Sequence, residues 1–416
     1  MESAAMHSAK QMLLVIGIIL AAGSLSGILS RKFNVPDVVI FLLIGIGLGP
    51  ELAGLVDVKT DTAFNQFILI FGSCYILFDG GASLSLKVLK EVWITIVILS
   101  TLGVLITCGI TGFAATHILG IPLLTALLLG AVLAATDPAT LVPVFKQVLI
   151  RERVAQTVMS ESAFNDVMGA IVTFSVLGIA YGTAGAFPLG RASFDLVTNA
   201  LIGVLVGGTL GYAAAFLIAH EKFSFLSEYA PLVTLMSVAG SYMTAETLNA
   251  SGFMAVFVFG IVLGNKDAFG FKMEQGEQEK LEDFILTTAL IMRMFIFILL
   301  GSQVNFGLMS KYLWSGIAIV GVLIFIARPV TVFCCALPDR RAKWSLKEML
   351  FMCWTRETGV IPAALAGLLI GVKAPGAQII ASVTFIAILM TILVQATTTK
   401  WLAKKLGLLL DKERPG

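Results

Sequence analysis

The chain is built from long apolar runs separated by short polar connections. Hydrophobic residues make up 58% of its 416 residues and charged residues only 13%, about half the charged share of a typical soluble domain. Many runs reach the roughly 20 residues that an α-helix needs to cross a bilayer. We therefore predict an all-α, polytopic membrane protein with about 13 transmembrane helices. We place the segments at 12–30, 36–55, 63–84, 91–116, 122–146, 153–180, 194–219, 229–247, 250–265, 282–304, 312–337, 346–371 and 378–402.

Lysine and arginine are distributed unevenly between the two sides that these segments define. With the N-terminus outside, 20 of the 28 Lys and Arg residues lie on the cytoplasmic side and 5 on the outer side. Cytoplasmic loops are enriched in these residues. We therefore predict a multi-pass protein of the cell membrane with its N-terminus outside and its C-terminus in the cytoplasm. No basic tail indicates a nucleic acid partner, and no motif indicates a cofactor.

Two of the apolar segments are interrupted by charged residues. The fifth is broken by Thr136-Asp137-Pro138, and the twelfth by residues 355–359 (Thr-Arg-Glu-Thr-Gly). Pro138 has no N–H, so it cannot bond the carbonyl of Ala134, and we expect that carbonyl to be available to a cation. Paired broken helices are typical of transporters built from inverted repeats, with the binding site near the middle of the membrane.

The positions of the two breaks predict the domain organisation. A single transmembrane domain, 1–402, contains repeat one at about 12–180 and repeat two at about 229–402. A linker helix, 194–219, joins the repeats, and 403–416 form a short cytoplasmic tail. The connection 265–283 is the only long and charged one, and we interpret it as a solvated hinge.

The sixth segment carries four polar side chains inside an otherwise apolar helix. Ser162 and Asp166 are four residues apart and share one helix face, whereas Glu161 and Asn165 share the adjacent face, about 100° around the helix. Carboxylates at membrane depth are costly and indicate a functional site. Carboxylate, hydroxyl and carbonyl oxygens suit a hard monovalent cation. We therefore assign the face of Ser162 and Asp166 to the ion.

The adjacent face of the sixth segment requires a fixed cation, because an unpaired buried Glu161 would be very unfavourable. Three arginines inside membrane segments are candidates: Arg293, Arg328 and Arg356. Asp79, in the third segment, is followed by two glycines that permit the close approach of another helix. It is either a further ion-site residue or a carboxylate at a helix end.

Two motifs resemble a known family. Residues 135–138 (ATDP) and 160–166 (SESAFND) resemble the NhaP-type sodium/proton antiporters of the cation/proton antiporter superfamily, relatives of the animal sodium/hydrogen exchangers. Further matches lie at residues 36–50, 78–81, 327–329 and 355–359, so the resemblance spans nearly the whole chain.

The resemblance implies roles for the residues of the ion site. Asp166 matches the carboxylate that binds the ion and the proton. Thr136 would offer its main-chain carbonyl, Ser162 its hydroxyl, and Asp137 a carboxylate through water. Asp79 stands where relatives usually carry Glu, so we expect it to reach the ion through a bridging water.

The resemblance also implies supporting roles. Glu161 and Arg328 match a structural ion pair, and Asn165 marks the branch thought to be electroneutral. Arg356 matches an arginine of the second broken helix, but Glu357 stands where the animal exchangers have Gly, so the two could partly neutralise each other. The family further implies homodimers, for which Gly23-xxx-Gly27 offers a close-packing motif.

The function predicted on these grounds is secondary transport without enzymatic activity. The chain would exchange Na⁺, and also Li⁺, for H⁺ one for one by alternating access, in sodium transport and pH homeostasis. A K⁺/H⁺ antiporter of the same fold is the main alternative, because residue types do not fix cavity size. A channel is less favoured, since a pore does not need paired broken helices. An intramembrane protease is disfavoured because HExxH and GxGD are absent and Ser162 has no nearby His.

Overall fold

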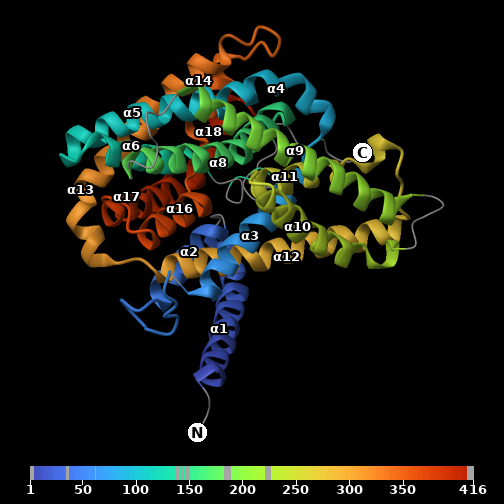
Figure 1. Ribbon diagram of the computed structural model, residues 1–416, viewed down its shortest axis with the longest axis horizontal. Helices are drawn as coiled ribbons and strands as arrows, with labels where there is room; N and C mark the ends of the chain where they lie inside the picture. Colours follow the sequence, from blue (N-terminus) through green and yellow to red (C-terminus); the bar gives the residue numbers. More distant parts are fainter. Residues whose placement is uncertain are drawn as a thin grey trace.

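The computed structural model describes residues 4–33, 37–60, 62–136, 141, 145, 150–181, 189–220 and 226–409. Within them the chain is almost entirely helical (Figure 1). Each of the thirteen predicted segments coincides with one helix or with consecutive helices. Eight helical stretches are long and apolar enough to cross a membrane. The all-α membrane fold predicted from the apolar runs is therefore confirmed.

The first half of the chain forms α1 (Ala4–Phe33), α2 (Asp37–Leu48), α3 (Ala63–Ala82), α4 (Leu86–Ser100), α5 (Leu102–Leu119), α6 (Leu123–Ala134), α8 (Glu152–Ala180) and α9 (Leu189–Ala219). The fourth predicted segment corresponds to α4 and α5. The fifth corresponds to α6 and to helical backbone at Leu141 and Phe145.

The second half forms α10 (Ala230–Thr247), α11 (Gly252–Gly264), α12 (Gln275–Ser302), α13 (Phe306–Val322), α14 (Arg328–Ala336), α15 (Leu346–Trp354), α16 (Val360–Gly371), α17 (Ala377–Met390) and α18 (Thr397–Leu406). Two π-helical stretches, Leu323–Ala327 and Thr391–Ala396, join α13 to α14 and α17 to α18. The twelfth predicted segment is the broken pair α15 and α16.

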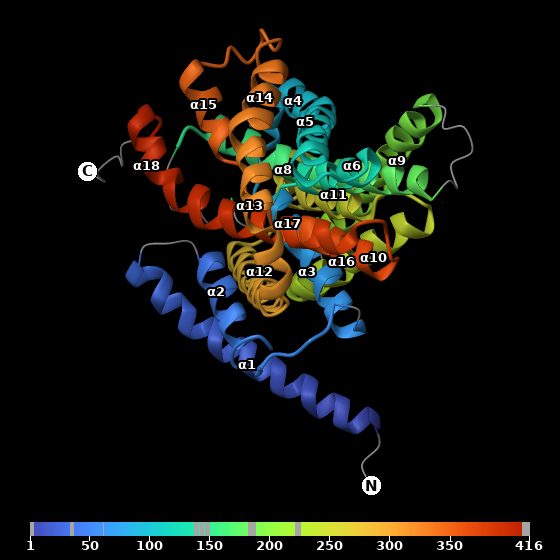
Figure 2. The ribbon, with the colours of Figure 1, turned by 90° about the vertical axis from the view of Figure 1, so that its left-hand side faces the viewer.

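The helices pack as two bundles. The frame bundle contains α1–α3 and α9–α12, in which α11 packs on α3 and α9, and α12 packs on α2 and α3. The site bundle contains α4–α6, α8 and α13–α18, in which α6 packs on α5 and α8. Each half of the sequence therefore contributes helices to both bundles, and segments far apart in the chain lie side by side (Figures 1 and 2).

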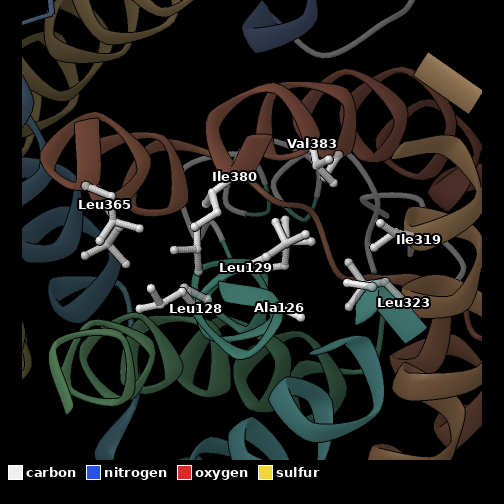
Figure 3. Close-up of a cluster of buried hydrophobic side chains, with 14 of the residues drawn as sticks. Ala126, Leu128, Leu129, Ile319, Leu323, Leu365, Ile380 and Val383 are labelled. Atoms are coloured by element: carbon white, nitrogen blue, oxygen red, sulfur yellow. The ribbon is translucent and has the colours of Figure 1, made fainter. Parts of the chain in front are cut away.

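The interior of the site bundle is closely packed hydrocarbon. Figure 3 shows Leu128 and Leu129 of α6 facing Ile380 and Val383 of α17, with Leu365 of α16 beside them. These side chains are almost completely buried. Because packed interiors resist deformation, this cluster holds the two broken helices in a fixed relation.

Hydrogen bonds connect loops and helix ends that the sequence places on one side of the membrane. Ser85 N–H donates to Gln156 Oε1, Leu86 N–H donates to Asn265 Oδ1, and residue 150 forms an antiparallel β-bridge with residue 409. We call this end of the molecule the basic face, because the segments that the sequence places on this side contain most of the Lys and Arg residues. At the opposite end, Gln303 Nε2 donates to Val58 O, and Tyr181 Oη to Val372 O.

Two boundary predictions were wrong. The second segment was expected to extend to residue 55, but α2 ends at Leu48, where turns centred on Gly49 and Gly54 begin. The connection 265–283 is exposed over most of its length, as expected, but it is not a hinge between bundles: it joins α11 to α12 within the frame bundle, and α12 already begins at Gln275. The charged residues at 274–283 were interpreted as part of a loop, whereas most of them lie on the exposed side of the first turns of α12.

Candidate functional site

The first broken helix ends beside α8. The chain leaves α6 in an extended conformation at Ala135. The backbone N–H of Thr136 donates to Asn165 Oδ1 at 3.1 Å, and its hydroxyl lies 2.7 Å from Ser162 Oγ. The hydroxyl also lies 3.0 Å from Asn165 Oδ1. The interruption predicted at Thr136 is therefore present, whereas Asp137 and Pro138 lie outside the described residues.

One face of α8 presents polar groups to this break. Ser162, Asn165, Asp166 and Gly169 follow the i, i+3, i+4, i+7 spacing of a single helix face. A Cβ atom on Gly169 would lie only 2.9 Å from the Ala135 Cβ, so glycine lets the break approach α8 beside Asp166. Asp166 is 1% exposed. The Asp166 carboxylate thus lies on the face of α8 that meets the broken helix.

Asn165 shares a helix face with Glu161, four residues before it, and its amide also reaches the break. Asn165 contacts the same residue, Thr136, that Ser162 contacts. Helical periodicity separates successive residues by about 100° around the helix axis. Only the position of the break shows that Ser162 and Asn165 both reach Thr136. Asn165 therefore fixes the backbone at the break directly.

Glu161 lies beside this face and binds an arginine. Arg328 binds both Glu161 carboxylate oxygens, Nη1 with Oε1 and Nη2 with Oε2, the second at 2.7 Å. Its Nε donates to the Met352 carbonyl at 3.0 Å. Both side chains are buried. This bidentate pair, the one implied by the family resemblance, joins α8 to α14, and the bond to Met352 adds α15, so that three hydrogen bonds of one guanidinium connect three helices.

The second broken helix reaches the end of the first through Arg356. Arg356 Nη2 donates to the carbonyls of Leu133 and Ala134, at 3.0 and 2.7 Å. These carbonyls end α6, where the helix dipole favours a positive charge. The Ala134 carbonyl was expected to find a partner such as a cation, and the cationic group that bonds it in the structure is the Arg356 guanidinium. Neutralisation of Arg356 by Glu357 is not needed to explain its position.

The backbone of the second break is supported by the π-helical stretch that follows α17. Thr358 N–H donates to Thr391 Oγ1 at 3.0 Å, and Gln395 Nε2 donates to the Trp354 carbonyl at 2.6 Å. Glu357 is completely buried at the same break. Side chains therefore hydrogen-bond backbone groups at both ends of the non-helical residues between α15 and α16.

Asp79 lies near the end of α3, in the frame bundle. It is buried, and it lines a cavity of about 230 Å³ at the basic face together with Ser83, Lys266 and Glu282. Arg293, considered above as a partner of Glu161, lies on α12 in the frame bundle. In the structure, Glu161 is paired with Arg328 instead.

The site combines one buried carboxylate, two hydroxyls and an amide around a broken helix. A carboxylate can bind either a proton or a cation, and hydroxyl and amide oxygens complete the coordination of a hard cation. Among the described residues, no group of three or more His, Cys, Asp or Glu side chains is suited to a resident metal. Two broken helices that meet beside a buried carboxylate define a class of protein, the secondary transporters with discontinuous helices.

Comparison with known proteins identifies the family within this class. The model of the sodium/hydrogen exchanger transmembrane family matches residues 17–405. Na(+)/H(+) antiporter 1 of Methanocaldococcus jannaschii is 34% identical over 84% of this chain and 81% of its own length. The K(+)/H(+) antiporter NhaP of Alkalimonas amylolytica is 29% identical over 96% of this chain and 68% of its own.

A solved structure agrees with these relatives. The sodium proton antiporter MjNhaP1 from Methanocaldococcus jannaschii at pH 8 superposes with a TM-score of 0.79 and 31% identity, covering 95% of this chain and 99% of the other. The chain belongs to the sodium/hydrogen exchanger family. Its relatives are transporters, and none of these comparisons indicates an enzyme family.

Proposed function

We propose that this protein exchanges Na⁺, and also Li⁺, for H⁺ one for one, with Asp166 as the site that both ions share. The observation that carries the proposal is the Asp166 carboxylate, buried on the face of α8 that contacts the first break. Thr136 and Ser162 would supply further oxygens. Asp137 and Asp79 would contribute through water.

The choice of Na⁺ over K⁺ is the part of this proposal that the relatives leave most open. The first relative above bears the name of a Na⁺ antiporter and the second that of a K⁺ antiporter. The test is exchange by the purified protein in proteoliposomes, with Na⁺, Li⁺ and K⁺ supplied separately against a proton gradient. Saturable exchange of Na⁺ and Li⁺ is expected. Exchange of K⁺ alone would favour the alternative, and flux without a counter-gradient of protons would indicate a channel.

The proposed orientation places the basic face in the cytoplasm, with an outer N-terminus and a cytoplasmic C-terminus. The distribution of Lys and Arg supports it. The hydrogen bonds that join the loop at 84–86 to Gln156, near the start of α8, and to Asn265 support the assignment of these segments to one side. Repeat one (12–180), the linker helix 194–219 and repeat two (229–402) remain our proposed organisation, with alternating access between the two bundles and a role in pH homeostasis.

Electroneutral exchange is a direct consequence of the proposed site. Asp166 holds either one proton or one monovalent cation, and its neighbour Asn165 adds no second titrating group. We expect a bell-shaped dependence of rate on pH, because protons fill the site at low pH and the returning proton is scarce at high pH. A potential imposed with valinomycin and K⁺ should leave the rate of Na⁺ exchange unchanged. A rate that follows this potential would show that a second titrating group takes part.

A homodimer is proposed from the exposed apolar surface of α1. Leu13, Leu14, Leu25 and Ile28 are each more than 60% exposed, and α1 lies along the outside of the molecule (Figure 2). The Gly23-xxx-Gly27 motif is only partly available, because Gly23 packs against Met294 of α12 in the same chain.

Chemical cross-linking in native membranes is expected to give a dimer band. Replacing Leu14 and Ile28 by bulky tryptophan should weaken that band, whereas the same change at exposed Leu232 of α10 should not. Cross-linking that yields monomer alone would contradict the dimer.

A further inference from the structure

The cavity at the basic face contains both a buried carboxylate and a buried ammonium. Its volume is about 230 Å³, and α3, α12 and the connection between α11 and α12 enclose it. Its polar lining consists of Asp79, Ser83, Lys266, Gln278 and Glu282. Glu282 is exposed and Asp79 is buried, so the cavity leads from the surface toward the inner carboxylate.

Lys266 is unusual because it is only 4% exposed, and lysines are rarely buried to this extent. The fold imposes the burial. Asn265 Nδ2 donates to the Leu84 carbonyl at 2.7 Å, and Phe271 N–H donates to the Lys266 carbonyl at 3.2 Å. These bonds hold the short 3₁₀ turn Lys266–Phe269 over the end of α3.

The charge of Lys266 is set by its surroundings. Burial lowers the pKa of its ammonium, while Asp267 on the same turn and Glu282 on α12 counteract that shift. Asp79 of α3 and Glu282 are the two carboxylates that line the cavity. A lysine ammonium is a compact point charge, similar in charge to the monovalent cation that the proposed function requires to enter here.

We propose that Lys266 is a tethered cation that competes with the substrate cation for the cavity leading to Asp79, and that it thereby sets the apparent affinity for the cation at the basic face. This inference rests on the proposed function. Like charges repel more strongly in a partly buried cavity than in water. The tethered ammonium therefore raises the cation concentration needed to fill the site. Lys266 acts through the electrostatic repulsion of its ammonium and does not bind the transported ion, so it is a positioning residue.

The test measures the KM for Na⁺ at the basic face, in everted membrane vesicles at pH 7 and constant ionic strength. Lys266→Gln is expected to lower this KM roughly tenfold, since one repulsive charge is removed from the cavity, with little change in the maximum rate. Lys266→Arg should keep the wild-type KM because it keeps the charge. Lys272→Gln removes the same charge from an exposed position on the same connection, and its KM should equal that of the wild type.

The outcomes separate this inference from its alternatives. An unchanged KM in Lys266→Gln, or an equal fall in Lys272→Gln, would overturn it. If Lys266→Gln does not fold, Lys266→Met keeps the apolar stem and provides the same test. Glu282→Gln, at an exposed position, makes the cavity more positive and should raise the KM, so an unchanged value there would also overturn the inference. A wild type that exchanges no cation would instead refute the proposed function.

Discussion

Replacement of Asp166 by asparagine is expected to abolish cation/proton exchange while leaving the protein folded. Asparagine has almost the same shape as aspartate but cannot bind and release a proton near neutral pH. It also removes the negative charge that would attract the cation. Asp166 lies on the α8 face that meets the break, and no other described carboxylate of α8 lies at an equivalent position to replace it.

The measurement is Na⁺-dependent proton flux in proteoliposomes containing equal amounts of folded protein. The thermal midpoint of Asp166→Asn in detergent should remain close to that of the wild type. Asp283→Asn, which neutralises an exposed carboxylate on α12, is the matched control and should transport normally. Near-normal exchange by Asp166→Asn would refute the assignment of the shared site.

Arg328→Ala is expected to cause a large loss of stability. It leaves Glu161 buried without its bidentate partner and leaves the Met352 carbonyl without its donor. Breaking a buried pair by removing one partner typically costs about 3–5 kcal/mol. The thermal midpoint in detergent should therefore fall clearly, and Glu161→Ala should show a fall of similar size.

The pair can be tested further with a double mutant. Since the second substitution removes the charge that the first left unpaired, Glu161→Ala with Arg328→Ala should cost less than the sum of the two single changes. Arg340→Ala, at an exposed position, should leave the midpoint almost unchanged. Stable folding of Arg328→Ala would show that the Glu161–Arg328 pair contributes little to the fold.

Much of the fold followed from local chemistry. Apolar runs of bilayer length can satisfy their backbone only as helices, so the number and approximate positions of the helices could be predicted. The breaks were predictable because Pro138 removes a helix donor and because charged residues interrupt the second apolar run at 355–359. The need for Glu161 to have a buried cationic partner followed from the cost of an unpaired charge.

The sequence by itself therefore determined which residues could form an ion site and that they lie in broken membrane helices. Only the tertiary structure decided which groups meet. Arg356 caps a helix end more than 200 positions away, Asn165 reaches Thr136, and Lys266 is buried by a turn that Asn265 holds against Leu84. Helical periodicity fixes the face on which a side chain lies. Packing between helices that are distant in the chain decides which residues that face contacts. A local sequence pattern contains no information about such distant helices.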